Sequence, residues 1–242
     1  MKLGKLLVVL LGPQGVGKTT QALLLKKKLS RLGYRVTITE SIYHTIILKI
    51  WYKLIITLTG RRIRYKFHPN GAIEEFVEPN MLKRMINIDF MINLISAVIS
   101  ALKIRLLSAI FPIVIEHEGF LYNQVAYLSF IYRKHMDIRT LIDKYCIFLR
   151  LIPKNALVIV LDVARLRQED LQARYRRRGS LSEPWYYIKH QSLIYKALAR
   201  LCQKYVILDA GMDGNSLSKL TTNFVLQSLS GEETSCPRTK NR

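Results

Sequence analysis

The sequence predicts an α/β fold in which a five-stranded parallel sheet carries helices on both faces. Short apolar runs alternate with segments of helical periodicity, which is the pattern of βαβ units. The runs are almost continuously apolar, as expected of strands that are covered on both faces. At 242 residues, of which 50% are hydrophobic, we expect one domain over residues 1–229 and a disordered polar tail over residues 230–242.

The elements follow one another in a regular order along the chain. The strands are expected at Leu6–Leu11, Tyr34–Thr39, Ile113–Ile115, Leu157–Leu161 and Tyr205–Leu208. The helices are expected at Thr19–Leu32, Ser41–Thr57, Met81–Ser108, Tyr122–Tyr132, Ile138–Leu149, Leu166–Arg178, Tyr186–Gln203 and Ser216–Ser228. Because ligands of open parallel sheets bind at the carboxyl ends of the strands, the residues after each strand are the candidates for chemistry.

Two of these elements also look like membrane or targeting signals. Leu6–Leu11 follows lysines, as the core of a secretory leader does, but it is too short for one and runs into a glycine-rich loop. The apolar segment Met91–Ile115 is cut by Lys103 and Arg105 into runs shorter than the about 18 residues of a spanning helix. We therefore expect a buried strand, a core helix followed by a strand, no transmembrane segment and a cytoplasmic protein.

The net charge indicates which partners the protein could bind, and the cysteine content indicates its cellular compartment. The chain has 38 lysine and arginine residues and 17 aspartate and glutamate residues, a formal net charge of +21. Its surface should attract anions such as nucleotides, nucleic acid, acidic proteins or acidic lipid. Cys146, Cys202 and Cys236 are far apart, which argues against a disulfide scaffold or a zinc site and suits a reducing compartment.

The most specific signal is a glycine-rich motif directly after the first strand. It matches the pattern G-x-x-x-x-G-K-[ST] with Gly12, Pro13, Gln14, Gly15, Val16, Gly17, Lys18 and Thr19. Small residues let backbone N–H groups wrap a polyphosphate, and the next helix offers its positive N-terminus to the anion. We expect these residues and Thr20 to bind ATP, with Lys18 on the phosphates and Thr19 on Mg²⁺. The motif predicts a P-loop NTPase fold.

On these residues the chain resembles the thymidylate kinase-like family of P-loop nucleoside monophosphate kinases. Gly12–Gln21 reads GPQGVGKTTQ, similar to the opening motif of that family. The similarity continues in outline to about Ser228, with an Ala126-Tyr127 pair after the third strand, arginines in the lid position and Asp209 at the end of the last strand. The resemblance implies an ATP-dependent nucleotide kinase.

Two glutamates, Glu116 and Glu118, follow the third strand. Spaced by two in an extended segment, they point the same way, and P-loop enzymes need a carboxylate here for Mg²⁺ or its water. The resemblance places Glu118 at the aspartate of the family and Gly119 at its arginine. We expect Thr19 with Glu116 or Glu118 to hold Mg²⁺ and Glu118 to be catalytic; the alternative is that the glutamates only cap the strand. We expect His117 to face outward or to pack.

The helix expected at Leu166–Arg178 has four arginines among its last five residues. Arg174, Arg177 and Arg178 share a helix face, and Arg176 adds a fourth positive charge. Arginine neutralises a transferring phosphoryl group with several donors in one plane. The resemblance implies a mobile lid here, with Arg174 and Arg178 as catalytic residues. The alternative is that these arginines only offset the helix dipole.

The helix Ser41–Thr57 combines an apolar stripe with basic residues. Large apolar residues recur at helical spacing at Tyr43, Ile46, Ile47, Ile50, Leu54 and Leu58, and basic residues follow at Arg61, Arg62, Arg64, Lys66 and His68. Three interpretations stay open: a core-packed helix with a solvated basic loop, a patch for nucleic acid or an acidic partner, and a basic amphipathic helix on a membrane surface.

The donor side of the expected site is complete, whereas the acceptor side is altered. Where acceptor-binding arginines would be expected, the chain has Ser41, Met91 and Gly119. The sequence therefore predicts an ATP- and Mg²⁺-dependent phosphotransferase that transfers to a small molecule, by resemblance a nucleotide, with dTMP a poor acceptor. The alternative is a nucleotide-binding switch, or an NTPase that associates with nucleic acid through the basic surface. A homodimer is left open.

Overall fold

Five parallel strands form the central sheet of the protein, in the order β2-β5-β1-β6-β7. The computed structural model describes residues 5–40, 46–60, 62–66, 73–77, 84, 86–117, 119–132, 137–177 and 183–230. The strands of the sheet are β1 (Leu6–Leu11), β2 (Val36–Thr39), β5 (Ile113–Glu116), β6 (Ala156–Asp162) and β7 (Lys204–Asp209). The predicted α/β class and five-stranded parallel sheet are confirmed, and each strand lies within two residues of its expected bounds.

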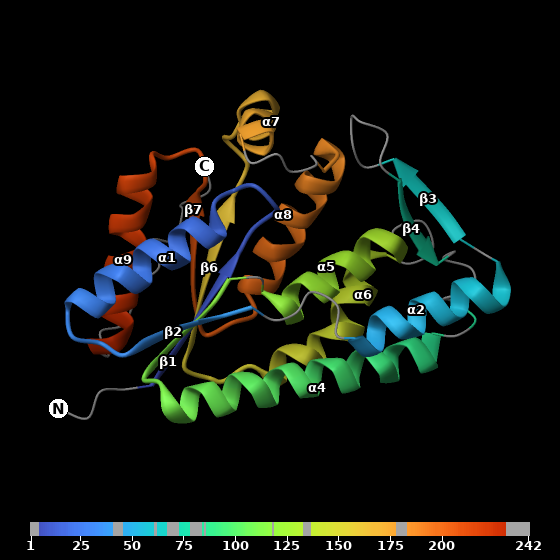
Figure 1. Cartoon of the computed structure of the whole chain (residues 1–242), viewed down its shortest axis with the longest axis horizontal. Coiled ribbons are helices and arrows are strands. Elements are labelled where there is room, and N and C mark those ends of the chain that lie inside the picture. Colours follow the sequence, from blue (N-terminus) through green and yellow to red (C-terminus); the bar gives the residue numbers. More distant parts are fainter. Residues whose placement is uncertain are drawn as a thin grey trace.

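Helices cover both faces of this sheet (Figure 1). One face carries α1 (Lys18–Arg31) and α9 (Gly214–Ser230), and the other carries α4 (Ile86–Ile110), α5 (Phe120–Tyr132) and α8 (Trp185–Ala199). Packed onto this second layer are α2 (Ile46–Thr59), α6 (Ile138–Tyr145) and the 3₁₀ helix η1 (Cys146–Leu151). The short helix α7 (Gln168–Arg177) lies beyond the carboxyl ends of the strands, at the top of Figure 1.

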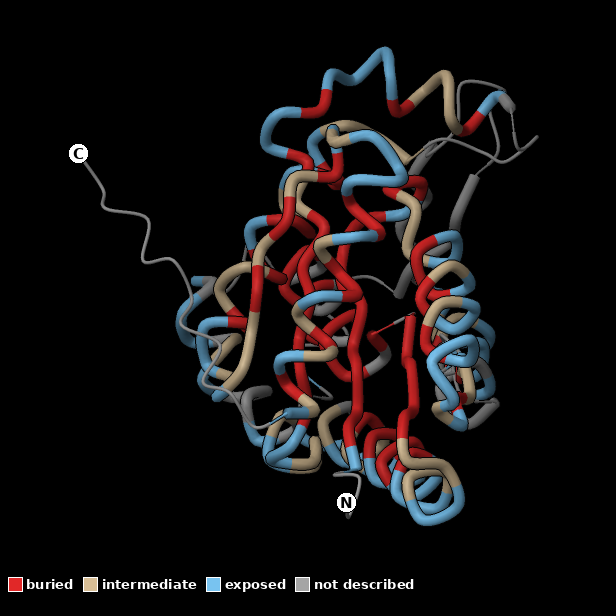
Figure 2. Tube along the Cα trace, turned by 90° about the vertical axis from the view of Figure 1, so that its left-hand side faces the viewer, coloured by how far each residue is buried: buried red, intermediate tan, exposed pale blue. Residues whose placement is uncertain are grey.

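The central strand β1 is buried on both sides. Leu7, Val9 and Leu11 belong to the core under α5 and α8, whereas the alternate residues of the strand belong to the core under α1 and α9. All six residues of β1 are buried, and Figure 2 shows the strands as the buried centre of the molecule. This double coverage is the reason why the strands are continuously apolar in sequence.

The basic segment after α2 contains a strand and is not the loop of the first of our three interpretations. Strand β3 (Arg62–Lys66) pairs with β4 (Ile73–Val77) in a separate two-stranded antiparallel sheet. The register sets Arg64 opposite Glu75 and Tyr65 opposite Glu74. The basic charge suggested a loop, but Arg62, Arg64 and Lys66 alternate with Ile63 and Tyr65. This period of two is typical of a strand.

The helix α4 is only partly the core helix that we expected. Over Phe90–Ile110 it is long and apolar enough to cross a membrane by length and composition, but only 33% of its most apolar window is buried in the fold. It packs with one face against β5 and α5. At the other end of the chain, α9 continues to Ser230, one residue beyond the predicted domain boundary, and the predicted tail after it lies outside the described residues.

Candidate active site

The phosphate loop, residues 12–19, joins β1 to the N-terminus of α1. Since β1 lies between β5 and β6, the loop stands where crossover connections leave the sheet in opposite directions, which is where ligands of such folds bind. Gly12, Gly15 and Gly17 have φ angles of 150°, 80° and 101°, conformations that residues with a side chain rarely adopt. The glycines of the motif are therefore required by the backbone path of the loop.

Contacts from β6 and α7 hold this path. A Cβ atom on Gly12 would lie 2.8 Å from the carbonyl oxygen of Leu161, and one on Gly15 would lie 3.1 Å from the ring of Tyr175. The Tyr175 hydroxyl donates a hydrogen bond of 2.9 Å to the carbonyl oxygen of Gln14. Leu171 and Tyr175 are both buried. Sequence reasoning did not single out these two residues, although their spacing of four on α7 places them on one helix face.

Lys18 lies across the phosphate loop. Its Nζ donates to the carbonyl oxygens of Gly12 at 2.8 Å and of Pro13 at 3.0 Å. Thr19 and Thr20 follow in the first turn of α1 and are exposed. That first turn contains no acidic residue that would repel a phosphate. The expected donor-site residues 12–20 are thus brought together at the positive end of α1, in an arrangement that fits a bound polyphosphate.

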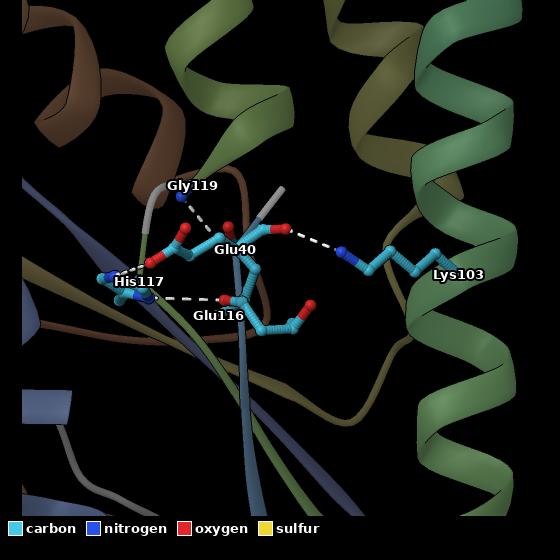
Figure 3. Close-up of polar contacts among 6 residues, drawn as sticks. Glu40, Lys103, Glu116, His117 and Gly119 are labelled. Atoms are coloured by element: carbon cyan, nitrogen blue, oxygen red, sulfur yellow. Dashed lines mark hydrogen bonds and ion pairs between the residues drawn. The ribbon is translucent and has the colours of Figure 1, made fainter. Parts of the chain in front are cut away.

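Glu116 ends β5 next to the central strand. Its carboxylate is buried, and one oxygen accepts a hydrogen bond of 2.6 Å from the backbone N–H of Gly119 (Figure 3). Burial first, then contact with Cys202 and the charge of Glu116, raise the pKa of Tyr122 well above its ordinary value, so the phenol stays neutral beside the carboxylate. Glu118, the other expected carboxylate, lies outside the described residues.

Gly119, the position at which the sequence resemblance implies an arginine, has a backbone that does not suit a side chain. Its φ is +56°, in the region that disfavours residues with a side chain. A Cβ atom at this position would overlap the side chain of Leu11. An arginine here would have to strain the backbone and displace a core leucine.

The carboxyl ends of β2 and β5 form a second polar cluster: Thr39, Glu40, Glu116 and His117 (Figure 3). We call it the acceptor edge only because the sequence resemblance implies the acceptor side at the neighbouring Ser41 and Gly119. The Nδ1 of His117 lies 3.3 Å from the carbonyl oxygen of Thr39, and its Nε2 lies 3.5 Å from the Glu40 carboxylate. The His117 side chain is 3% exposed, so of the two expected placements, facing outward or packing, the structure shows packing. The Glu40 side chain, in contrast, is 71% exposed at the edge.

The expected lid arginines are only partly described. Arg174 is half-buried and donates a hydrogen bond of 3.2 Å to the carbonyl oxygen of Ala210, which follows β7. Arg176 is exposed, Arg177 lies in the last turn of α7, and Arg178 lies outside the described residues. In this structure Arg174 therefore joins α7 to the carboxyl end of the sheet.

The side chains present suit a metal that arrives with a nucleotide. In the described part of the chain, no three histidine, cysteine, aspartate or glutamate side chains gather into a metal-binding group. Mg²⁺ is commonly held by one or two protein ligands together with substrate phosphates, a role that Thr19 and Glu116 can fill. Asp162, at the end of β6, is already bound by the Ser192 hydroxyl at 2.6 Å and by Lys196 at 3.0 Å, and it anchors α8.

The five-stranded parallel sheet and the glycine-rich loop at the end of β1 together form a P-loop fold. No family model and no curated protein matches the sequence. Among solved structures, the chain is similar to deoxyadenosine kinase from M. mycoides with bound dATP, with a TM-score of 0.51 and 17% sequence identity. The similarity covers 91% of this chain and 99% of that one, and it confirms the P-loop α/β fold that the sequence predicts.

Proposed function

We propose that the protein is an ATP- and Mg²⁺-dependent phosphotransferase of the nucleoside and nucleotide kinase type. The observation that carries this proposal is the phosphate loop, whose three glycines with positive φ lie at the end of the central strand under α7. A fold like that of a deoxyadenosine kinase supports the assignment. ATP with its Mg²⁺ would supply the phosphoryl group, and transfer would depend on positioning and charge neutralisation.

Each part of the donor site has a defined role in this proposal. The loop amides bind the phosphates, and Lys18 exchanges its contacts with Gly12 and Pro13 for contacts with phosphate oxygens. The Thr19 hydroxyl and Glu116 or Glu118 hold the metal. Arg174 in α7 and Arg178, which follows α7 in the sequence, would neutralise the transferring group once Arg174 leaves the Ala210 carbonyl oxygen.

The acceptor edge favours a neutral hydroxyl acceptor, such as the sugar of a nucleoside, over a nucleoside monophosphate. A phosphate dianion needs fork-shaped arginine contacts to be held in line, whereas Ser41, Met91 and Gly119 stand at the corresponding places. The exposed Glu40 carboxylate would repel such a dianion. A hydroxyl acceptor meets no such repulsion, and a carboxylate is suited to take its proton.

The test is a transfer assay with ATP labelled in the γ-phosphate and a panel of nucleosides, nucleoside monophosphates and nucleic-acid ends. We expect labelled nucleoside monophosphate as product, at a kcat/KM at least tenfold above that for dTMP, and loss of transfer in Lys18→Ala. Efficient dTDP formation, at about 10⁴ M⁻¹s⁻¹ or more, would contradict the acceptor class but not the transferase. ATP hydrolysis without transfer to any acceptor would contradict the transferase and favour an NTPase.

A further inference from the structure

Helix α4 exposes a stripe of large apolar side chains. Six of them form what we call the apolar stripe: Met91, Ile95, Ile99, Leu102, Leu106 and Ile110. Each of these side chains is between 46% and 67% exposed. Their spacing of three and four residues places them on one face of the helix. Single exposed apolar residues are ordinary on a protein surface, but a continuous row of them over about five helical turns marks a surface that contacts something apolar.

The buried face of α4 shows that the fold itself does not account for this stripe. The described residues that α4 buries are Asn93, Ser96, Ala97, Ser100, Ala101 and Ile104, and Phe90, Leu94 and Leu107 pack against the core in part. The helix therefore docks through a few large apolar residues and several small or polar ones, and it leaves the six residues of the stripe outside. Packing within the chain does not require these outward side chains to be apolar, because only buried apolar surface stabilises a docked helix.

The neighbouring helix α2 has the same character. It packs against α4, and the two helices run side by side along one flank of the molecule (Figure 1). Ile50, Leu54 and Leu58, spaced by four, are 61%, 46% and 74% exposed. Two adjacent helices thus each carry an exposed apolar row. Both helices lie on the side of the molecule away from α1 and α9 (Figure 1).

The charges of α2 and α4 are almost all positive. The two helices contain Lys49, Lys53, Lys103 and Arg105 and one acidic residue, Asp89. In α4, Lys103 and Arg105 lie on opposite sides of the apolar stripe, since they follow Leu102 by one and three positions in a helix of 3.6 residues per turn. Lys53, Lys103 and Arg105 are exposed, and Lys103 also donates to the carbonyl oxygen of Glu40 at 2.8 Å. An apolar row with basic residues beside it is typical of a helix that lies in a membrane interface.

We propose that the α2–α4 flank docks on the surface of a bilayer that contains anionic lipid. The apolar stripe enters the boundary between headgroups and acyl chains, and Lys53 and Arg105 contact lipid phosphates. Helix α4 lies in the plane of the membrane, because its other face stays packed against β5 and α5. A second copy of the chain is a poorer occupant, since two molecules of formal charge +21 repel each other. Nucleic acid would leave the apolar stripe in water.

The test is flotation of the full-length protein with vesicles of phosphatidylcholine, with and without phosphatidylglycerol. We expect binding to the vesicles with phosphatidylglycerol, weakened by salt. Leu102→Ser with Leu106→Ser should reduce that binding at least tenfold, because each leucine contributes on the order of one tenfold step in affinity when it is buried. Lys53→Ser and Arg105→Ser should each reduce it about fivefold.

A matched control uses exposed leucines elsewhere. Leu23 on α1 and Leu193 on α8 are 58% and 55% exposed, and Leu23→Ser with Leu193→Ser should leave vesicle binding unchanged. Mg²⁺·ATP binding should be equal in all these variants. Absence of vesicle binding by the wild type, or equal binding by both leucine pairs, would overturn the proposal. So would analytical ultracentrifugation that shows a dimer which only the Leu102 and Leu106 changes dissociate, with no vesicle binding.

Discussion

Gly119 connects β5 to α5 with a φ of +56°, and its position against Leu11 leaves no room for a side chain. We expect Gly119→Ala to lower the free energy of unfolding by about 1–3 kcal/mol, from backbone strain and overpacking together. Urea denaturation measures this change. Gly214→Ala is the control: it begins α9, has an ordinary φ and would meet no atom within 4 Å. Equal losses in both variants would contradict this explanation of Gly119.

Glu116 lies at the end of β5, one of the two strands that flank β1. Glu116→Gln keeps an oxygen for the Gly119 N–H and removes the charge. If Glu116 holds the metal, kcat should fall about 100-fold or more while ATP affinity changes little, since such a charge acts mainly in the reacting complex. The same measurement on Glu118→Gln identifies which glutamate acts. Unchanged turnover in both variants would exclude the predicted metal site.

At the scale of elements, α7 sets the shape of the phosphate loop from a distant part of the sequence. Tyr175→Phe removes the hydrogen bond to the Gln14 carbonyl oxygen and leaves the packing against Gly15. We expect a loss of about 1 kcal/mol in unfolding free energy and a several-fold rise in the Kd for Mg²⁺·ATP. Glu169→Ala, an exposed change on the same helix, should alter neither quantity. An unchanged Kd would mean that α7 supports the fold but not nucleotide binding.

Elements that depend on a local pattern could be predicted from the sequence, whereas contacts between distant segments could not. The strands of the parallel sheet were predictable because continuous apolar runs are a local signal, and the phosphate loop was predictable because its requirements are met within eight residues. The contact of Tyr175 with Gln14 joins residues 161 positions apart, so no local pattern contains it. The burial of His117 likewise depends on β2, whose Thr39 lies 78 positions away. The outward apolar stripe of α4 was hidden because apolar periodicity does not reveal which helix face meets the domain.

At the scale of the whole molecule, the proposed phosphoryl transfer and the proposed membrane docking lie on two different surfaces. The carboxyl edge of the sheet carries the phosphate loop, Glu116 and the acceptor edge, and the α2–α4 flank carries the apolar stripe. They meet where Lys103 of α4 donates to the Glu40 carbonyl oxygen (Figure 3). The two proposals can fail separately, because the variants that test nucleotide binding and the variants that test vesicle binding change different residues.

Calorimetric titration of the wild type and of Lys18→Ala with Mg²⁺·ATP decides whether the phosphate loop binds a nucleotide through Lys18. Loss of a charge-assisted contact with phosphate, at about 1.5–3 kcal/mol, should weaken binding on the order of 10- to 100-fold without changing the unfolding transition. Lys27→Ala, an exposed lysine on the same helix, should bind as the wild type does. Equal ATP affinity in the wild type and Lys18→Ala, or no ATP binding by the wild type, would contradict the proposed phosphotransferase.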